Sequence, residues 1–183
     1  AAAWEQVGKV SFGDLDISED GRWLYVVNLY DRKLYQMDLT DPFNPVAPVL
    51  ADVGTKVKGF TIPDPCSGNA GEHMPFAVKV TRGKVFVGLV CNGQALNGTT
   101  VGTANDLMGY IYEFDVATET FNPTPVLSFP LNYRAATANP WLPWTNRFQS
   151  YFEGAGFPMI TDIEFDGKGN MIIGMVDRRG HQA

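Results

Sequence analysis

Short runs of alternating apolar and polar residues, separated by turn sequences, recur along this chain and constrain its fold more than any other feature. The stretch GDLDISEDGRWLYVVNLYDRKLYQMDL, residues 13–39, contains three such runs joined by EDG and YDR. Alternation with a period of two, interrupted by Gly, Asn and Asp, is typical of half-buried β-strands connected by tight turns. Helical periodicity is hard to find anywhere in the chain, so we expect an all-β protein.

The pattern of a strand, a turn and a second strand recurs twice, as PFAVKVTRGKVFVGLVC at residues 75–91 and as MITDIEFDGKGNMIIGMV at residues 159–176. Repeated units of meandering antiparallel strands, with loops between them, are typical of β-propeller blades. A β-sandwich is the alternative, but it does not predict the same strand-turn-strand phrase three times. We therefore expect residues 1–183 to form one β-propeller segment. Its blade units would be about 12–50, 75–130 and 159–183, with inserts at 92–109 and 132–158.

These motifs together resemble the YVTN/NHL-type propeller repeat. More specifically, they resemble the propeller region of large secreted bacterial surface proteins, where it accompanies serine-aspartate-repeat-type β-sandwich modules. The resemblance implies a fold and an extracellular or cell-surface location, and it says little about activity because the matching residues are mostly strand and turn residues. Closed propellers typically have about four to eight blades. The repeats in this chain amount to about two and a half to three, so we expect a partial propeller.

The two cysteines, Cys66 and Cys91, lie in a loop and at the end of a predicted strand. If Arg82 and Gly83 form a two-residue turn, counting back along the hairpin places Cys91 opposite Met74, near the loop that carries Cys66. A disulfide here would tie the loop to the blade, and the family resemblance supports it. The alternative is two unrelated buried thiols. A disulfide would indicate an extracytoplasmic compartment.

Charge and hydropathy exclude several classes of partner. The chain has 14 Lys and Arg against 20 Asp and Glu, and its basic residues are scattered rather than gathered into a stripe. This distribution argues against nucleic acid as the main partner. The longest apolar runs have the length of strands, whereas a membrane-spanning helix needs about 20 residues. We therefore expect no membrane-spanning segment.

Asp14 and Asp162 occupy equivalent places when the repeats are aligned on their first strands, which line the central channel of a propeller. Two carboxylates at one level of a channel could bind Ca2+, a cation that prefers oxygen ligands. The second repeat has Ala77 at this place, which would break a ring of ligands. The alternative is that these carboxylates accept hydrogen bonds from nearby backbone N–H groups. DGKGN at residues 166–170 is better explained as a hairpin turn than as a calcium loop.

Catalytic motifs are mostly missing. His73 and His181 have no recognisable partner, and the sequence contains no Gly-x-Ser-x-Gly nucleophile elbow. The spacings expected of zinc ligands and of a phosphate-binding glycine loop are also absent. We therefore expect no catalytic residues.

The insert at residues 132–158 differs from the rest of the chain by its cluster of aromatic residues with interleaved arginines. Its aromatic and basic side chains could stack on sugars or dock a partner protein. The alternative is that the insert folds over the propeller and buries its aromatic residues in a small satellite core. The candidate binding residues are Trp141, Trp144, Arg147 and Tyr151.

Three functions are consistent with these features. The first is a non-enzymatic structural or ligand-presenting segment of a secreted or cell-surface protein, with an adhesive, matrix or surface-layer role. Its partner would be a protein or glycan at the cell surface, or further copies of itself. The second is a metal-dependent hydrolase of the lactonase type, with Asp14 and Asp162 as metal ligands. The third is a carbohydrate-binding module that uses Trp141 and Trp144.

Overall fold

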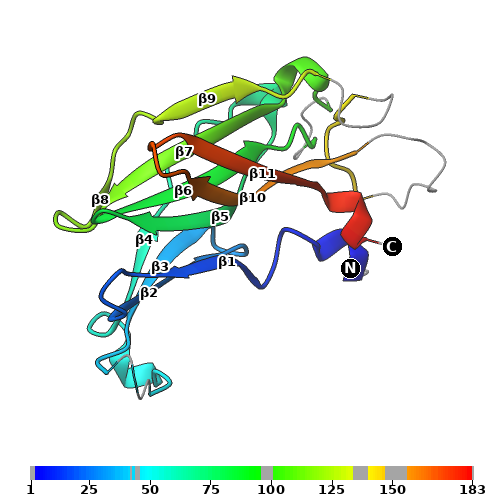
Figure 1. Ribbon diagram of the computed structural model, residues 1–183. Coiled ribbons are helices and arrows are strands. Elements are labelled where there is room, and N and C mark those ends of the chain that lie inside the picture. Colours follow the sequence, from blue (N-terminus) through cyan, green and yellow to red (C-terminus); the bar gives the residue numbers. More distant parts are fainter. Residues whose placement is uncertain are drawn as a thin grey trace.

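A computed structural model describes residues 3–41, 43, 46–95, 101–133, 140–146 and 156–182. In these residues the chain forms three antiparallel sheets and several short 3-10 helices, which confirms the all-β prediction. The sheets are open, and the described strands close neither a barrel nor a ring. Figure 1 shows the three sheets fanned side by side, with the two chain ends close together on one side.

Sheet 1 has four strands in the order β1-β2-β3-β4. The alternating runs of the first repeat form its first three strands, and the fourth follows a long connection that begins with the proline-rich residues after Asp38. The strands are β1 Phe12–Ile17, β2 Trp23–Asn28, β3 Lys33–Asp38 and β4 Val57–Thr61.

Sheet 2 has five strands, with β5-β6-β7-β8 in order and β9 paired to β7. Sheet 3 is the hairpin of β10 and β11. The strands are β5 His73–Thr81, β6 Lys84–Cys91, β7 Met108–Asp115, β8 Thr120–Phe121, β9 Leu127–Pro130, β10 Pro158–Phe165 and β11 Met171–Asp177. The 3-10 helices are η1 Ala3–Gln6, η2 Leu50–Asp52, η3 Gly68–Ala70, η4 Ala104–Asp106 and η6 Arg178–His181.

The first strand of every sheet contains one irregularity of register at the same place. The pairing shifts between Phe12 and Leu15 in β1, between Pro75 and Ala77 in β5, and between Ile160 and Asp162 in β10. An extra residue on one strand bends it and increases its twist. The structure thus repeats in detail, which supports the alignment of the first strands made from the sequence.

This bulge corrects the predicted register of the β5–β6 hairpin. Thr81 does pair with Lys84 as expected, but the extra residue moves the far end of the hairpin by one position. Cys91 therefore lies opposite His73, and Met74 lies opposite Val90. Counting from the turn assumed a regular ladder and so could not include the bulge.

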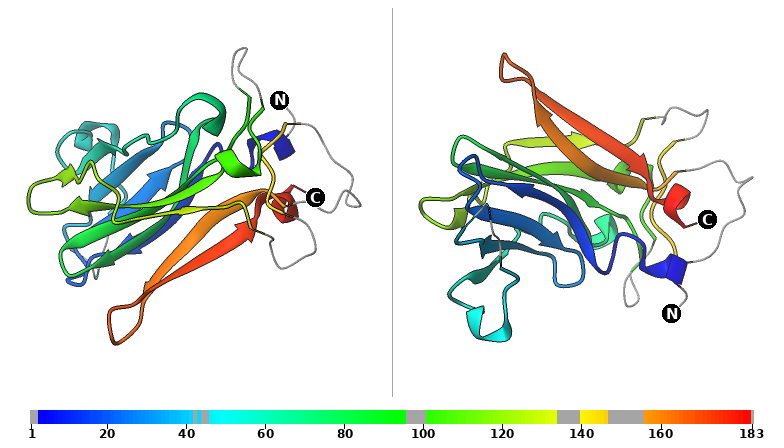
Figure 2. Two further views of the ribbon diagram at one scale, coloured as in Figure 1. Left: turned by 90° about the horizontal axis from the view of Figure 1, so that it is seen from above. Right: turned by 60° about the horizontal axis from the view of Figure 1, so that its bottom comes forward.

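The sheets pack face to face around two hydrophobic clusters. Figure 2 shows sheets 1 and 3 on opposite sides of sheet 2, and the first strands β1 and β10 both contact β5. The first cluster fills the space between sheets 1 and 2 and includes Tyr25, Val27, Val78 and Phe114. The second lies between sheets 2 and 3, and it also contains Trp141 and Trp144 from the long insert.

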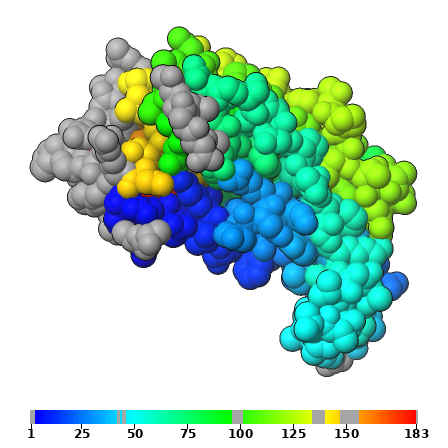
Figure 3. Space-filling view, turned by 180° about the vertical axis from the view of Figure 1, so that it is seen from behind, coloured from blue at the N-terminus to red at the C-terminus, as the bar shows by residue number. Residues whose placement is uncertain are grey.

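The described residues of the connection between β3 and β4, here called the arm, project from sheet 1. In Figure 3 the arm forms the cyan lobe that stands away from the rest of the molecule. Its apolar side chains are unusually exposed, with Leu50 at 90%. Because it touches so little of the fold, a substitution in the arm should leave the sheets intact.

Candidate functional site

Carboxylates along the start of the chain bind the backbone edge of β5. Asp14 Oδ2 accepts a hydrogen bond from the Val78 N–H at 3.1 Å, and Asp16 Oδ2 accepts one from the Val80 N–H at 2.8 Å. Glu19, in the turn that follows β1, accepts the Arg82 N–H at 2.9 Å. These three bonds, here called the carboxylate ladder, join sheet 1 to sheet 2.

The ladder shows how Asp14 is used in this structure. Its second oxygen accepts the N–H of Leu15 at 2.8 Å, so both oxygens bind backbone donors. Burial raises the pKa of Asp14, the two backbone bonds oppose that rise, and nearby Asp162 adds to it. This is the hydrogen-bonding role that the sequence left open beside calcium binding. Among the described residues, no group of three or more His, Cys, Asp or Glu side chains is arranged to hold a metal ion.

Asp162 and Asp14 are thus near one another, as the aligned first strands predict, but their surroundings differ. Asp162 is exposed on the outer face of sheet 3, opposite Gly174 of β11. The next acidic residue of β10, Glu164, forms an ion pair with Lys79 of β5 at 2.8 Å. Calcium binding by Asp14 and Asp162 stays a prediction, and a cation would have to compete with the backbone donors that Asp14 already binds.

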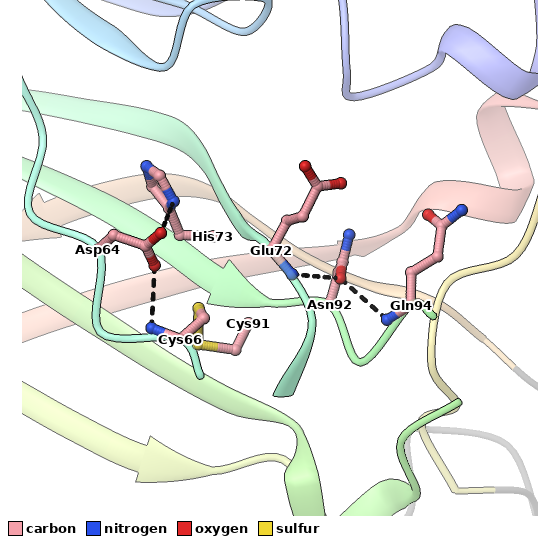
Figure 4. Close-up of a disulfide and its surroundings, with 7 residues drawn as sticks. All are labelled: Asp64, Cys66, Glu72, His73, Cys91, Asn92 and Gln94. Carbon is pink, nitrogen blue, oxygen red and sulfur yellow. Dashed lines mark hydrogen bonds and ion pairs between the residues drawn. A yellow bond between two sulfur atoms is a disulfide. The ribbon is translucent and has the colours of Figure 1, made fainter. Parts of the chain in front are cut away.

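The second cluster surrounds a disulfide between Cys66 and Cys91, whose Cα atoms are 5.6 Å apart (Figure 4). Asp64 accepts the backbone N–H of Cys66 at 2.9 Å, and its other oxygen lies 3.0 Å from Nδ1 of His73. The loop is therefore attached to sheet 2 both by a covalent bond and by a carboxylate between its own backbone and the start of β5.

His73 lies beside the disulfide because it pairs with Cys91 across the hairpin. The sequence indicated no partner for this histidine, because Asp64 lies earlier in the loop that precedes β5 and only the folded loop brings the two side chains together. Burial is the main cause that lowers the pKa of His73, while Asp64 opposes the shift and Arg32 adds to it. Its burial and its contact with Asp64 place the imidazole between the disulfide loop and the start of β5.

Asn92 organises the loops next to the disulfide (Figure 4). It is completely buried, and its side-chain oxygen accepts the N–H groups of Glu72 and Gln94, each at 3.0 Å. Its backbone oxygen accepts the N–H of Trp144 at 2.8 Å. Gly71 has a φ of +76°, and a Cβ there would lie 2.4 Å from the Asn92 side-chain oxygen, so this position requires glycine.

The tryptophans predicted to bind a sugar or a partner lie in the core. Trp141 is 7% exposed and Trp144 is 2% exposed, so neither ring offers a free face for stacking. The indole N–H of Trp144 donates to the Pro158 carbonyl at 3.0 Å. This is the satellite core that was the alternative interpretation of the insert. Arg147 and Tyr151, the other two candidates, lie outside the described residues.

A buried arginine, Arg178, holds the N-terminal segment against this core. It is 0% exposed and lies over the Trp144 ring, 4.5 Å from the ring centroid. Its guanidinium donates to the carbonyls of Glu5 at 2.9 Å, Val7 at 2.7 Å and Thr145 at 3.2 Å. Burial lowers the pKa of Arg178 to about 10, so it stays charged at neutral pH. Nothing in its sequence context distinguishes it from a surface arginine.

Lys9 lies near Arg178, next to a hollow of about 590 Å³ that Gln94, Trp144, Asn146 and Phe157 help to line. The Lys9 ammonium donates to Gln94 at 2.6 Å and to Asn146 at 2.9 Å. Burial lowers the pKa of Lys9 to about 8, and Arg178 adds to the effect. The two amide oxygens favour the charged form and accept two of the three N–H groups of the ammonium.

Comparison with known proteins finds relatives in the slime mould Dictyostelium discoideum. The chain is 29% identical to Colossin-A over 189 residues, an alignment that covers 97% of this chain and 2% of Colossin-A. It is 28% identical to Colossin-D over 178 residues, covering 96% of this chain and 16% of Colossin-D. It is 25% identical to Colossin-C over 186 residues, an alignment that covers 95% of this chain and 16% of Colossin-C. The chain therefore spans only a small part of each of these relatives.

These findings correct the family that the sequence motifs suggested. The relatives belong to a eukaryote, so the expectation of a bacterial surface protein is wrong. No known protein family matches the chain, the YVTN/NHL type included, and no solved structure matches it. The strand and turn residues that suggested the family follow from the repeat itself, which unrelated proteins can share. In the described part of the chain, no helix is long and apolar enough to cross a membrane.

Proposed function

We propose that this chain is a non-enzymatic structural or ligand-presenting segment of an extracellular or cell-surface protein. The Cys66–Cys91 disulfide is the observation that carries the proposal. Disulfides persist in oxidising compartments and are rare in the cytosol of most organisms. This one closes a loop onto a buried strand end, since Cys91 is 1% exposed, so its role is to stabilise the fold.

The arrangement of the sheets supports a propeller segment. The first strands of the three sheets lie next to one another, and each carries its bulge at the same place. Successive meander sheets that stack through their first strands are the basic arrangement of a propeller. On this proposal sheets 1, 2 and 3 are successive blades.

The relatives support a modular role. The matched region is a small fraction of Colossin-A, Colossin-D and Colossin-C. A region of this size within a much longer polypeptide is what we expect of one module among several. We propose that the module presents surfaces to a protein or glycan partner, and that the exposed arm between β3 and β4 is one of them.

The described geometry favours this role over a lactonase-type hydrolase. In a metal-dependent enzyme Asp14 would be a metal ligand, whereas here each of its oxygens already accepts a backbone N–H, which leaves only the remaining lone pairs for a metal. Metal analysis of the purified protein tests the alternative. A stoichiometric divalent ion that is lost in the Asp162→Ala variant would favour the hydrolase.

The proposal is tested by labelling cysteines in the protein as its own cells make it. We expect a tagged chain to be accessible to an impermeant reagent on intact cells or in the medium. We also expect Cys66 and Cys91 to react with a maleimide only after denaturation and reduction. Protein found in the cytosolic fraction with both thiols free would contradict the proposal.

A further inference from the structure

We propose that a cleft between sheets 1 and 2 binds a primary alkylammonium group, either the side chain of a lysine on a protein partner or a small free amine. The inference deepens the ligand-presenting role proposed above and rests on it. The cleft has a volume of about 290 Å³ and lies where the β1–β2 turn approaches the β5–β6 turn. Figure 1 shows both turns at the end of the sheets away from the two chain ends. Because pockets for drug-sized ligands have about 300 to 1,000 Å³, this cleft suits a group the size of one long side chain.

Two carboxylates stand at the mouth of the cleft, both on the β1–β2 turn. Glu19 accepts the backbone N–H of Arg82 at 2.9 Å with Oε1, so sheet 2 fixes its position. Asp20 accepts the Ser18 hydroxyl at 2.6 Å and the backbone N–H of Arg22 at 3.0 Å, both with Oδ1. In each residue these bonds use a single oxygen, and the other oxygen can accept a hydrogen bond from an ammonium group.

The inner part of the cleft is aromatic and apolar. Trp23 and Tyr25 come from β2, Val80 from β5, and Val116 directly follows β7. Tyr25 and Val80 are buried core residues, so these walls are preformed. A Cβ built on Gly83 would meet no other atom within 4 Å, so the cleft is open beside the β5–β6 turn. The methylene groups of an alkyl chain can pack against such walls while the charged end stays at the mouth.

The electrostatics of the cleft favour a cation. Burial raises the pKa of Tyr25, the hydrogen bond from Gln36 opposes the rise, and the charges of Glu119 and Asp20 add to it. Glu119 forms an ion pair with Lys58, so the carboxylates of the β1–β2 turn are the ones left for a ligand. Among the described residues that line the cleft, none is basic. A phosphate or carboxylate ligand would therefore be repelled, whereas an ammonium group would be attracted.

The Trp23 ring already contacts one cation of the protein itself. The guanidinium of Arg22 lies 4.9 Å from the ring centroid. Asp38 pairs with this guanidinium at 3.0 Å and balances its charge. Because an aromatic ring attracts cations through its electron-rich face, Trp23 adds a second favourable interaction for a ligand that brings an ammonium group.

The test is a heteronuclear NMR titration of the intact chain with N-acetyl-lysine N-methylamide at neutral pH. We expect saturable shifts of the Trp23 indole N–H and of the backbone signals of residues 18–22 and 82–83, with a dissociation constant of about 1 mM. N-acetyl-norleucine N-methylamide has the same butyl stem without the ammonium group. It should bind about tenfold more weakly, because it cannot pair with the carboxylates at the mouth.

Glu19→Gln and Asp20→Asn test the carboxylates directly. Each variant retains the oxygen that accepts the bonds within the protein, so each should fold, which near-UV circular dichroism checks. We expect each to weaken binding of the lysine probe about three- to fivefold. Glu164→Gln, on sheet 3, removes the same charge away from the cleft and is the matched control, with unchanged binding.

Three results would overturn the inference. They are a native chain without saturable shifts at the cleft, a norleucine probe that binds as tightly as the lysine probe, and Glu19→Gln and Asp20→Asn variants that bind like Glu164→Gln. Titration with n-butylamine separates the two sources of the ammonium group. Tighter binding of the lysine probe assigns the cleft to a lysine of a protein partner, and equal or tighter binding of butylamine assigns it to a free amine. Failure of the titration would leave the disulfide and the cellular location untouched, and these are what test the proposed function.

Discussion

Asp16 joins two sheets by accepting the backbone N–H of Val80 at 2.8 Å with one carboxylate oxygen and the N–H of Ile17 at 2.8 Å with the other. The Asp16 side chain thus accepts a backbone N–H at the edge of β5, as the carbonyl of a neighbouring strand does elsewhere in a sheet. Since Val80 is 8% exposed, its N–H depends on this acceptor rather than on water.

Asp16→Ala should therefore lower the free energy of unfolding by about 1 to 3 kcal/mol, the cost of an unsatisfied buried donor. Asp16→Asn retains an acceptor oxygen and should cost less. Urea denaturation measures both. Glu164→Ala is the matched control, because this equivalent residue forms an exposed ion pair with Lys79 worth about 0 to 1 kcal/mol. Equal losses at positions 16 and 164 would contradict the role assigned to Asp16.

The disulfide should contribute substantially to stability. Cys66 and Cys91 are separated by 25 residues in sequence, and a loop of this size gives about 3 to 4 kcal/mol through the entropy of the unfolded chain. We expect a reductant to lower the melting temperature of the native chain measured by circular dichroism. The Cys66→Ser and Cys91→Ser double variant should melt at this lower temperature, and the reductant should not change it further. A native chain insensitive to the reductant would show that the loop is held by other contacts.

Arg178 should be essential for attaching the N-terminal segment. Arg178→Met leaves the carbonyls of Glu5, Val7 and Thr145 without this donor, and we expect a loss of about 3 kcal/mol in unfolding free energy. Limited proteolysis should then cleave within residues 3–9 at a protease concentration that spares the native chain. Arg22→Met, which removes an exposed ion pair with Asp38, should leave the unfolding free energy nearly unchanged. Resistance to proteolysis in Arg178→Met would contradict this role.

His73 should make the fold less stable in mild acid. Its pKa is lowered by burial, so below the ordinary histidine value, about 6.5, the unfolded chain binds a proton that the native chain does not. Stability therefore falls as the pH decreases from that value toward the lowered pKa, and no penalty remains above it. We expect His73→Gln to show a shallower loss of unfolding free energy between about pH 7 and pH 5. An unchanged slope would show that another group controls the loss.

The sequence determined the strands that begin each repeat. Alternation and the turns at Gly21, Gly83 and DGKGN were enough, because these features act over a few neighbouring residues. In the last turn Asp166 accepts the N–H groups of Lys168 and Asn170, each at 2.8 Å, as a hairpin turn requires. The strands β4 and β9 were missed, because each is short and is joined to its partner by a long connection rather than a tight turn.

Less of the candidate site than of the fold could be predicted from the sequence. The residues of the disulfide were found, since a cysteine pair has few alternatives, but the bulge that sets Cys91 opposite His73 was not. The contact of His73 with Asp64 and the three carbonyls around Arg178 join segments whose proximity depends on the folded loops.

The sequence by itself determined the all-β class, the repeat and the cysteine pair, because local periodicity and composition encode them. Only the tertiary structure decided that Asp14 and Asp16 bind the edge of β5, that Trp141 and Trp144 are core residues, and that Leu15 is exposed. The physical reason is that burial and hydrogen-bond partners belong to pairs of sheets. An alternating strand has the same sequence whether its apolar face is covered or free.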